Sequence, residues 1–434
     1  MPRLWLVALF IFAFAARAAE HPYSILQGAT SSTTTYLTIL ADEKDPIEVF
    51  ATETGRWIQP AAVLRHVYPG SRNVIYQVRF DDLKPDRAYR LEVRSIGRAV
   101  TDRRVFRTRG SKTKGRVALL SCMLRQFHNP FMWNAIERER PDTILITGDA
   151  AYLDRDFLPL SRNPRTGRQA WDAFSATRAR VKLYRYETLI PTYAVWDDHD
   201  AGGDNVTSTL ALMSEIRDIY RVMFGGQEIP GEVTNGPGVA KRLDLFGRRF
   251  ILLDGRSFRD FNSLSPWLGA PQERWMLDGL QPGPNFLVSG SQFFGGYIMK
   301  DSLEANWPDY TEKFLKRLNR KVHEIDARVT FASGDVHFSE IQEIESEALG
   351  YRTYEITSSS VHSFAFPGHY MIKPKNPRRR AVTGTHNAVI LDLDAATPFK
   401  TRVHAVGWRG NELFEADLDI DPCLNALLPT ERTR

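Results

Sequence analysis

The chain has 434 residues, of which 43% are hydrophobic and 25% are charged, and its formal net charge is +5. This length can supply a sizeable core, divided between two domains. Two of the basic residues lie in the N-terminal segment described next, so the remainder carries 5 − 2 = +3. So mild an excess favours phosphate-bearing substrates and gives no reason to expect specific nucleic-acid binding.

The first eighteen residues have the pattern of a secretory signal peptide. A start containing Arg3 is followed by an apolar run at 4–15 and by Ala16-Arg17-Ala18. A charged start, a short apolar core and an A-x-A ending are typical of a signal peptide. The apolar run is too short to span a membrane. No Arg-Arg pair precedes the apolar run, which favours the Sec route over the twin-arginine route. No later segment resembles a transmembrane span, so we expect an exported protein, periplasmic or extracellular.

Residues 19–109 predict a domain built of strands. Short runs at 36–40, 47–50, 73–78 and 88–93 are separated by turn residues. Pro85 precedes the strand-borne Tyr89 in the pattern of a tyrosine corner, which ties two sheets together through a hydroxyl. We expect a small immunoglobulin- or fibronectin-like β-sandwich, followed by a polar linker at 109–115.

From Arg116 onward, strands alternate with helices, which favours a layered α/β architecture for the catalytic domain expected at 116–434. We expect helices at 130–140, 170–189, 208–224 and 307–326. Strands are expected at 116–120, 142–147, 192–195, 239–245, 249–253, 285–288 and 327–333. In the tail, 389–391, 402–406 and 413–418 predict paired antiparallel strands that close a second sheet.

Acidic residues and histidines directly follow three of these strands. The three strand ends are Gly148-Asp149, Trp196-Asp197-Asp198-His199-Asp200 and Gly334-Asp335-Val336-His337. Apolar, β-branched runs of this kind are typical of buried parallel strands, and ligands bind at the C-terminal ends of such strands. The sequence therefore predicts a cation site with hydrolytic chemistry on an anionic substrate.

The residue types at these ends suit metal binding. Asp149 can bridge two cations, because a carboxylate has two oxygens and Gly148 removes steric bulk. Tyr152 lies three residues on, where its phenolic oxygen can reach the same ion, and a phenolate favours a hard trivalent metal such as Fe(III). Further oxygen and nitrogen ligands are Asp198, Asp335 and His337.

Three neighbouring residues have other expected roles. His199 adjoins a ligand and can face the substrate as an acid or as a charge stabiliser. Asp197 is expected to support the ligands from behind, or to cap a helix, more than to bind metal itself. Arg256 can fork onto a phosphate, with a salt bridge to Asp254 or Asp260 as the alternative.

The chain has two cysteines, Cys122 and Cys423. In an exported protein, two cysteines fit one disulfide. Cys122, however, directly follows the strand at 116–120, where a thiolate would join the predicted metal ligands. The residues alone leave both interpretations open.

Five motifs follow one another along the chain: Ser121-Cys122, Gly148-Asp149-x-x-Tyr152, Trp196-Asp197-Asp198-His199-Asp200, Leu253-Asp254-x-Arg256 and Ser333-Gly334-Asp335-Val336-His337. Their order resembles that of the PhoD-like alkaline phosphatases, in the calcineurin-like metallophosphoesterase superfamily. The resemblance covers the chain from about residue 116 onward, and the preceding β-domain is similar to the family's N-terminal domain. It implies a four-layer α/β/β/α metallophosphoesterase domain after a small immunoglobulin- or fibronectin-like β-sandwich.

The resemblance also implies a role for each motif residue. The implied metal ligands are Cys122, Asp149, Tyr152, Asp198, Asp335 and His337. Cys122 stands at the Asp of the superfamily's D-x-H motif, and Asp198 at the Asn of its N-H-D/E motif. The implied cofactors are Fe and Ca in a mixed multinuclear site, with Cys122 and Tyr152 on the iron side. His199 is similar to the catalytic histidine. On this resemblance Cys122 is a ligand, and Cys423 is a free or buried thiol.

The chain departs from the family pattern at three places. A tyrosine-rich continuation after Tyr152 is replaced by residues 153–156. Where many relatives have Glu-Val and then asparagines, this chain has 201–204 and then Asn205, which we expect near the substrate. The superfamily's intermediate histidine motif is absent, and Gln292 falls at its place as a ligand, a substrate contact or a structural residue.

We therefore expect an exported metal-dependent phosphoester hydrolase of the PhoD alkaline phosphatase type, in which a metal-activated hydroxide attacks phosphorus. One alternative keeps the metal site but takes a phosphodiester, such as a phospholipid, a teichoic-acid-like polymer or a nucleotide. A second alternative is a non-catalytic protein that binds a surface through its β-sandwich. The complete set of ligand residues counts against this second alternative.

Overall fold

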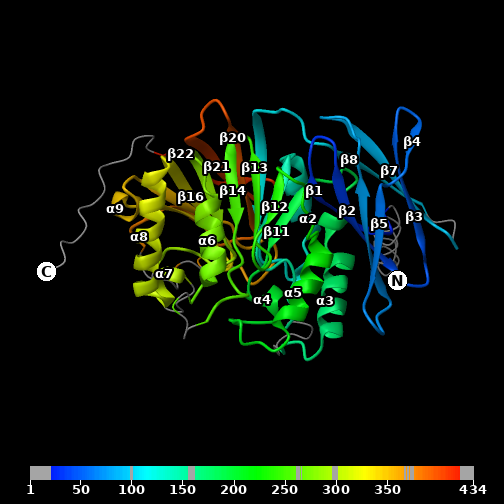
Figure 1. Cartoon of the computed structure of the whole chain (residues 1–434), viewed down its shortest axis with the longest axis horizontal. Helices are drawn as coiled ribbons and strands as arrows, with labels where there is room; N and C mark the ends of the chain where they lie inside the picture. The colour runs from blue at the N-terminus through cyan, green and yellow to red at the C-terminus, as the bar shows by residue number, and fades with distance from the viewer. Residues whose placement is uncertain are drawn as a thin grey trace, which may run out of the picture.

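The described part of the chain has a mixed α/β structure with four β-sheets (Figure 1). The computed structural model describes residues 21–97, 101–154, 162–260, 264, 266–295, 302–365, 368, 371 and 376–420. The expected signal peptide and Cys423 lie outside these residues. Within them, no helix is long and apolar enough to cross a membrane.

The N-terminal strands form two four-stranded sheets, in the orders β1-β2-β6-β5 and β4-β3-β7-β8. The strands are β1 (Ser24–Thr30), β2 (Thr35–Asp42), β3 (Ile47–Glu53), β4 (Arg56–Ile58), β5 (Ala62–Val67), β6 (Asn73–Phe80), β7 (Ala88–Ser95) and β8 (Thr101–Arg107). Alternating side chains of β7 are buried in a core shared by both sheets. The expected tyrosine corner is present, because the Tyr89 hydroxyl accepts a hydrogen bond from the Lys84 backbone N–H at 2.7 Å.

A six-stranded sheet has the order β11-β10-β9-β20-β21-β22. Its strands are β9 (Lys114–Leu120), β10 (Thr143–Thr147), β11 (Thr192–Val195), β20 (Asn387–Asp394), β21 (Lys400–Gly407) and β22 (Glu412–Asp419). The first three are parallel, as expected of strands that deliver ligands at one edge. The tail strands do not close a second sheet, and that prediction is wrong. The apolar β20 pairs antiparallel with β9, so the tail extends the same sheet.

An eight-stranded sheet has the order β12-β13-β14-β15-β16-β18-β17-β19. Its strands are β12 (Val233–Asn235), β13 (Lys241–Leu245), β14 (Arg248–Leu252), β15 (Gly283–Val288), β16 (Ala327–Ser333), β17 (Ser339–Ile344), β18 (Thr353–Thr357) and β19 (Arg379–Thr383). Strands β14, β15, β16 and β18 are parallel neighbours. Their C-terminal ends therefore lie at one edge of this sheet.

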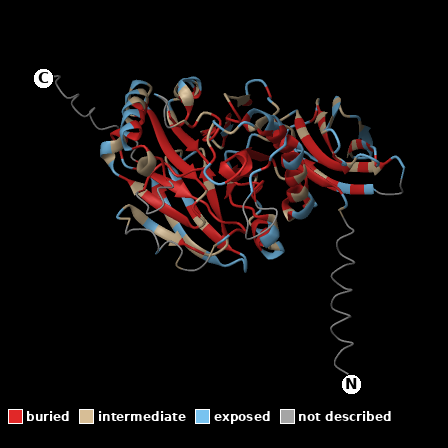
Figure 2. Ribbon diagram, turned by 90° about the horizontal axis from the view of Figure 1, so that it is seen from below, coloured by how far each residue is buried: buried red, intermediate tan, exposed pale blue. Residues whose placement is uncertain are grey.

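Buried side chains join these elements into large cores. One core contains residues of both large sheets and of α6 (Gly269–Gly279) and α8 (Pro308–Glu324). A second core joins the six-stranded sheet to α2 (Pro130–Arg138), α3 (Gly167–Arg180) and α5 (Met213–Phe224). The other helical turns among the described residues are η2 (Arg125–Phe127), η3 (Lys182–Arg185), α4 (Asp198–Ala201), α7 (Leu303–Asn306) and α9 (Ser346–Leu349). Figure 2 shows the strands of the large sheets as mostly buried.

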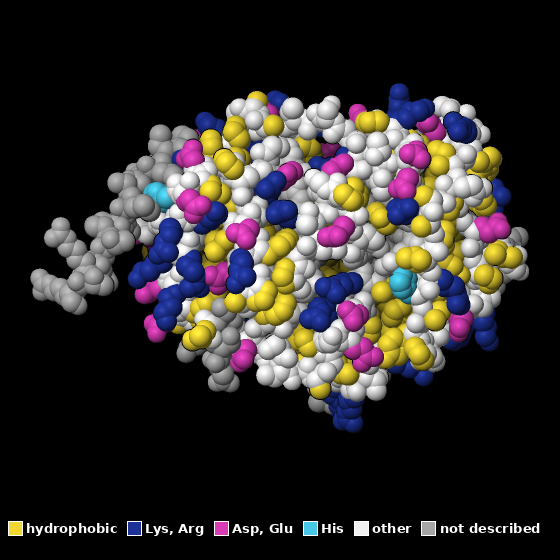
Figure 3. Space-filling model, viewed as in Figure 1, with side chains coloured by type: hydrophobic (Ala, Val, Ile, Leu, Met, Phe, Trp, Pro, Cys, Tyr) yellow, Lys and Arg dark blue, Asp and Glu magenta, His cyan; other side chains and the backbone are white. Residues whose placement is uncertain are grey.

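Two predicted helices are shorter than expected. The helix expected at 170–189 ends at Arg180, because Val181 is extended and η3 follows. The helix expected at 208–224 begins only at Met213, after a turn segment. Basic and acidic side chains are interspersed over the face that Figure 3 shows, in keeping with the small net charge.

Candidate metal centre

The candidate centre lies where strand ends of the two large sheets meet. Two glycines permit this close approach. A Cβ on Gly334 would lie 2.2 Å from the carbonyl oxygen of Thr147 in the six-stranded sheet, and one on Gly148 would lie 3.1 Å from the Cα of Gly290, which follows β15 of the eight-stranded sheet. Gly148 also has a φ of +83°, which L side chains rarely adopt. The Gly-Asp pairs of the sequence therefore bring carboxylates of one sheet against those of the other.

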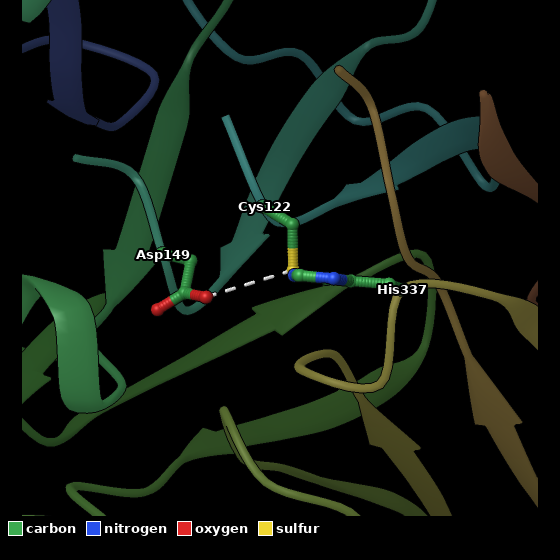
Figure 4. Close-up of side chains that lie close together, drawn as sticks. All are labelled: Cys122, Asp149 and His337. Carbon is green, nitrogen blue, oxygen red and sulfur yellow. Dashed lines mark hydrogen bonds between the residues drawn. The ribbon is translucent and has the colours of Figure 1, made fainter. Parts of the chain in front are cut away.

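Cys122, Asp149 and His337 form the first group of converging ligand atoms (Figure 4). Their ligand atoms all lie within 4.8 Å of one another, and the Cys122 sulfur is 3.6 Å from Asp149 Oδ2. Tyr152 joins them, because its hydroxyl oxygen lies 3.1 Å from His337 Nε2. The structure thus brings together the thiol, carboxylate, phenol and imidazole that the sequence placed in one site.

Two further groups continue from the first. Asp149, Asp198 and His199 form one, and Asp197, Asp198 and Asp335 form the other. Asp149 belongs to the first and second groups, and Asp198 to the second and third, so the three groups form a row with shared carboxylates. Asp149 is 1% exposed, and its Oδ1 has no hydrogen-bond partner among the described residues. A buried carboxylate oxygen without a donor is what a cation-binding position requires.

Burial governs the protonation of this cluster. It raises the pKa of the Cys122 thiol, of the Asp149 carboxyl and of the Tyr152 phenol. A bound cation would favour the ionised form of each, since an opposite charge offsets the cost of burial. Burial alone would raise the pKa of Asp198 as well, but the charge of Arg256 and two backbone N–H donors lower it below its usual range. The donor set therefore fits a cluster of cations.

His199 is held by an acid that the sequence did not assign. Its Nδ1 lies 2.7 Å from Asp154 Oδ1, and its ring stacks on Tyr152 with centroids 4.1 Å apart. Burial alone would lower its pKa, but the nearby carboxylates of Asp198 and Asp149 raise it to about 10. Because Asp154 occupies Nδ1, Nε2 is the nitrogen that remains for a ligand or a substrate.

Arg256 pairs with Asp197 and not with the acids offered by the sequence. Its Nε donates to Asp197 Oδ1, and its Nη2 lies 3.8 Å from Asp198 Oδ2. The salt bridge with Asp254 or Asp260, which was the alternative to a phosphate contact, is not formed. Asp254 accepts instead from the Arg256 backbone N–H, at 3.0 Å. Asp197 also precedes α4 as its N-cap residue, one of the two supporting roles expected of it.

The side chains of Asn205 and Gln292 make no hydrogen bond to the three ligand groups among the described residues. The backbone N–H of Asn205 donates to Asp198 Oδ2 at 2.8 Å, while its side chain is exposed. The Gln292 amide is fully buried and donates to Glu340 at 3.0 Å and to Thr357 at 2.7 Å. These bonds give Gln292 a structural role, and contact of either residue with a substrate stays a prediction.

Sequence patterns missed the loop that follows β18. Ser359 Oγ lies 3.0 Å from the Cys122 sulfur and accepts the His337 backbone N–H at 2.9 Å. Ser363 Oγ lies 3.1 Å from the Tyr152 hydroxyl oxygen. The serine run at 358–360 is visible in the sequence, but it matches no ligand pattern, so nothing local pointed to these contacts.

A scan against protein-family models finds no match to this chain, and a search of curated proteins finds none that matches it. The functional argument below therefore depends on the geometry of the site and on the motifs of the sequence.

Proposed function

We propose that this protein is a metal-dependent phosphoester hydrolase of the PhoD-like type, exported through its first eighteen residues. The observation that supports this most is the row of three ligand groups sharing Asp149 and Asp198. Adjacent cations that share carboxylates suit in-line displacement at phosphorus, because they hold the attacking and leaving oxygens together. The two large sheets and the helices beside them are compatible with the four-layer α/β/β/α arrangement, which belongs to the same proposal.

The donor types suggest which ion each end of the row would hold. Cys122 and Tyr152 would hold iron, since thiolate and phenolate suit a transition metal. Asp198 and Asp335 would hold calcium, which prefers oxygen ligands. When bound, these cations supply an activated water and neutralise phosphoryl oxygens.

The chain's own residues would perform the remaining tasks. Asp149 offers one oxygen to each of two neighbouring groups. Arg256 would orient the buried Asp197 and Asp198 through its guanidinium. His199, oriented by Asp154, would give a proton to the leaving oxygen through Nε2.

The decisive test is Asp149→Asn, assayed on a panel of phosphomonoesters and phosphodiesters together with elemental analysis. We expect hydrolysis and bound metal to be lost. Asp45→Asn is the matched control, because Asp45 is also a buried carboxylate but accepts hydrogen bonds from Tyr23 and Ser95 in the β-sandwich. Equal rates for the parent and the Asp149 variant on every substrate would reject catalysis and favour the surface-binding alternative.

A phosphodiester with an apolar group is the second candidate substrate. Two exposed aromatic rings lie beside His337. Phe364 is 42% exposed, and its ring centroid lies 6.4 Å from that of His337. Phe127 packs edge-on against Phe364, with ring centroids 5.0 Å apart. Exposed aromatic clusters at the mouth of a site bind apolar ligand groups.

This second candidate is tested by the double variant Phe127→Ala, Phe364→Ala. If the substrate has an apolar group, kcat/KM should fall for a phospholipid diester and stay near the parent's value for a small water-soluble monoester. An equal change for both substrates would count against an apolar contact.

A further inference from the structure

Arg259 lies in the loop between β14 and α6, three residues after Arg256. Its side chain is buried, with the residue 4% exposed. Its Nη2 donates to Ser291 Oγ at 2.9 Å, and Arg256 donates to the same oxygen at 3.1 Å. The Ser291 hydroxyl in turn lies 3.2 Å from Asp197 Oδ1. One hydroxyl thus joins Arg259 to the ion pair behind the candidate metal centre.

Arg259 uses few of its donors. Its Nε donates to the Gly255 carbonyl at 2.9 Å and its Nη2 to Ser291, whereas Nη1 has no hydrogen-bond partner among the described residues. Over the same part of the chain, no carboxylate lies within ion-pair distance of it. Of its five N–H groups, two are therefore satisfied.

Three other buried arginines of this protein make four or five hydrogen bonds each. Arg178 makes five hydrogen bonds to the β-sandwich and α5. Arg248 donates to four backbone carbonyls. Arg104 forks onto Asp102 and reaches two carbonyls as well. Among these four buried arginines, Arg259 therefore donates the fewest hydrogen bonds, and its partner Ser291 also contacts Asp197 beside the candidate site.

The guanidinium is also held in place. It lies over the Trp307 ring, 5.1 Å from the centroid. The Arg259 carbonyl accepts hydrogen bonds from the backbone and the hydroxyl of Ser208, at 3.1 and 3.0 Å. The side chain therefore has a fixed direction, as expected of a group that binds a ligand.

The charge of Arg259 is poorly compensated. Burial, and next the charge of Arg256, lower its pKa to about 9, against the opposing effect of Asp197, Asp198 and Asp335. The group is still protonated at neutral pH. A buried charge of this kind is costly unless an anion pairs with it.

We propose that Arg259 binds the phosphoryl group of the substrate, while Arg256 orients Asp197. This inference rests on the proposed function and adds a division of roles between two arginines. A tetrahedral phosphate dianion fits, because the planar guanidinium can present two parallel N–H donors to two phosphate oxygens. Arg256 cannot do the same with its Nε, since that donor is bound to Asp197.

The test is the binding of inorganic phosphate to the full-length, metal-bearing protein, measured by calorimetry. Arg259→Gln should weaken phosphate binding about 10- to 100-fold, as expected for a charged hydrogen bond, and leave the metal content unchanged. Arg259→Lys should recover part of the affinity, because lysine keeps the charge but lacks the fork. Arg249→Gln is the control, since Arg249 lies near the start of β14 and pairs with Asp244.

Two results would overturn the inference. One is an unchanged phosphate affinity in both Arg259 variants when the parent protein is active. That result would leave the proposed function intact. The other is loss of metal together with phosphate in the folded Arg259→Lys protein, which would place Arg259 in support of the metal ligands. A parent that neither binds phosphate nor hydrolyses any phosphoester would instead reject the proposed function, and the inference with it.

Discussion

Removing Arg256 should destabilise the folded protein far more than removing an exposed arginine. The side chains of Arg256 and Asp197 are 2% and 0% exposed, so neither charge is screened by water. In Arg256→Leu, Asp197 would keep only the Ser291 hydroxyl as a side-chain donor. Removing one member of a buried ion pair costs about 3–5 kcal/mol, because the other charge is left uncompensated.

A double-mutant cycle isolates this ion pair. Asp197→Asn removes the orphaned charge, so the double variant Arg256→Leu, Asp197→Asn should be less destabilised than the sum of the two single variants. Contacting buried groups give interaction energies of about 0.5–3 kcal/mol in such cycles. Urea unfolding should be followed by circular dichroism, with saturating metal and again with a chelator, because bound metal adds its own stability.

The opposite result would refute this reasoning. If Arg256 serves only the substrate, Arg256→Leu should change the free energy of unfolding by less than about 0.5 kcal/mol, as surface substitutions do. It would then raise KM and leave the chelated protein as stable as the parent. Additive effects of the two single variants would also contradict a direct pair.

Two other predictions concern the metal ligands and the proton donor. Cys122→Ser should lose most of the transition metal and the activity while the circular dichroism spectrum is retained, and a disulfide between Cys122 and Cys423 in an active protein would contradict it. His199→Ala should keep its metals and lose about 10²–10⁴-fold in rate, less for substrates with good leaving groups, as measured by kcat and elemental analysis. Loss of metal in that variant would make His199 a ligand instead.

Local patterns predicted the strands and their ends, because each is encoded within about ten residues. A short β-branched run followed by Gly and Asp specifies a buried strand and a tight exit, and the parallel pairing of β9, β10 and β11 agrees. The helix at Pro130 was predicted for the same reason, since a proline favours a helix start. The sheet that receives the tail was not predictable in this way. Val389 pairs with Leu119, and no local pattern specifies so distant a partner.

The same distinction applies inside the site. The convergence of Cys122, Asp149 and Asp198 was predicted, because these residues follow three parallel strands whose C-terminal ends share one edge. The ion-pair and hydrogen-bond partners of the charged side chains were not predicted, because each partner follows a different strand from the side chain that it contacts. The only ion-pair partners that the sequence suggested for Arg256 were acids within four residues of it, yet its partner Asp197 follows β11 in the other large sheet. Asp154 was missed for the same reason, since only the fold places it beside His199.

Backbone strain explains why the loop after β18 belongs to this centre. Cys122, Asp149, Asp335 and His337 all have φ between 55° and 69°, a region that costs a non-glycine residue about 1–3 kcal/mol. Such conformations persist only where the surroundings over-determine them.

The loop at 358–363 supplies that constraint around the first ligand group. The Ser358 carbonyl accepts a hydrogen bond from the Ser121 hydroxyl at 2.7 Å, and the Ser359 hydroxyl accepts one from the backbone N–H of His337. From the same loop, the backbone N–H of His362 donates to the Cys122 carbonyl at 3.3 Å. The thiol and the imidazole are thus held toward a common point before any ion arrives. Ligand atoms held in this way by the loop at 358–363 are preorganised, which is what a precise binding site requires of the residues behind it.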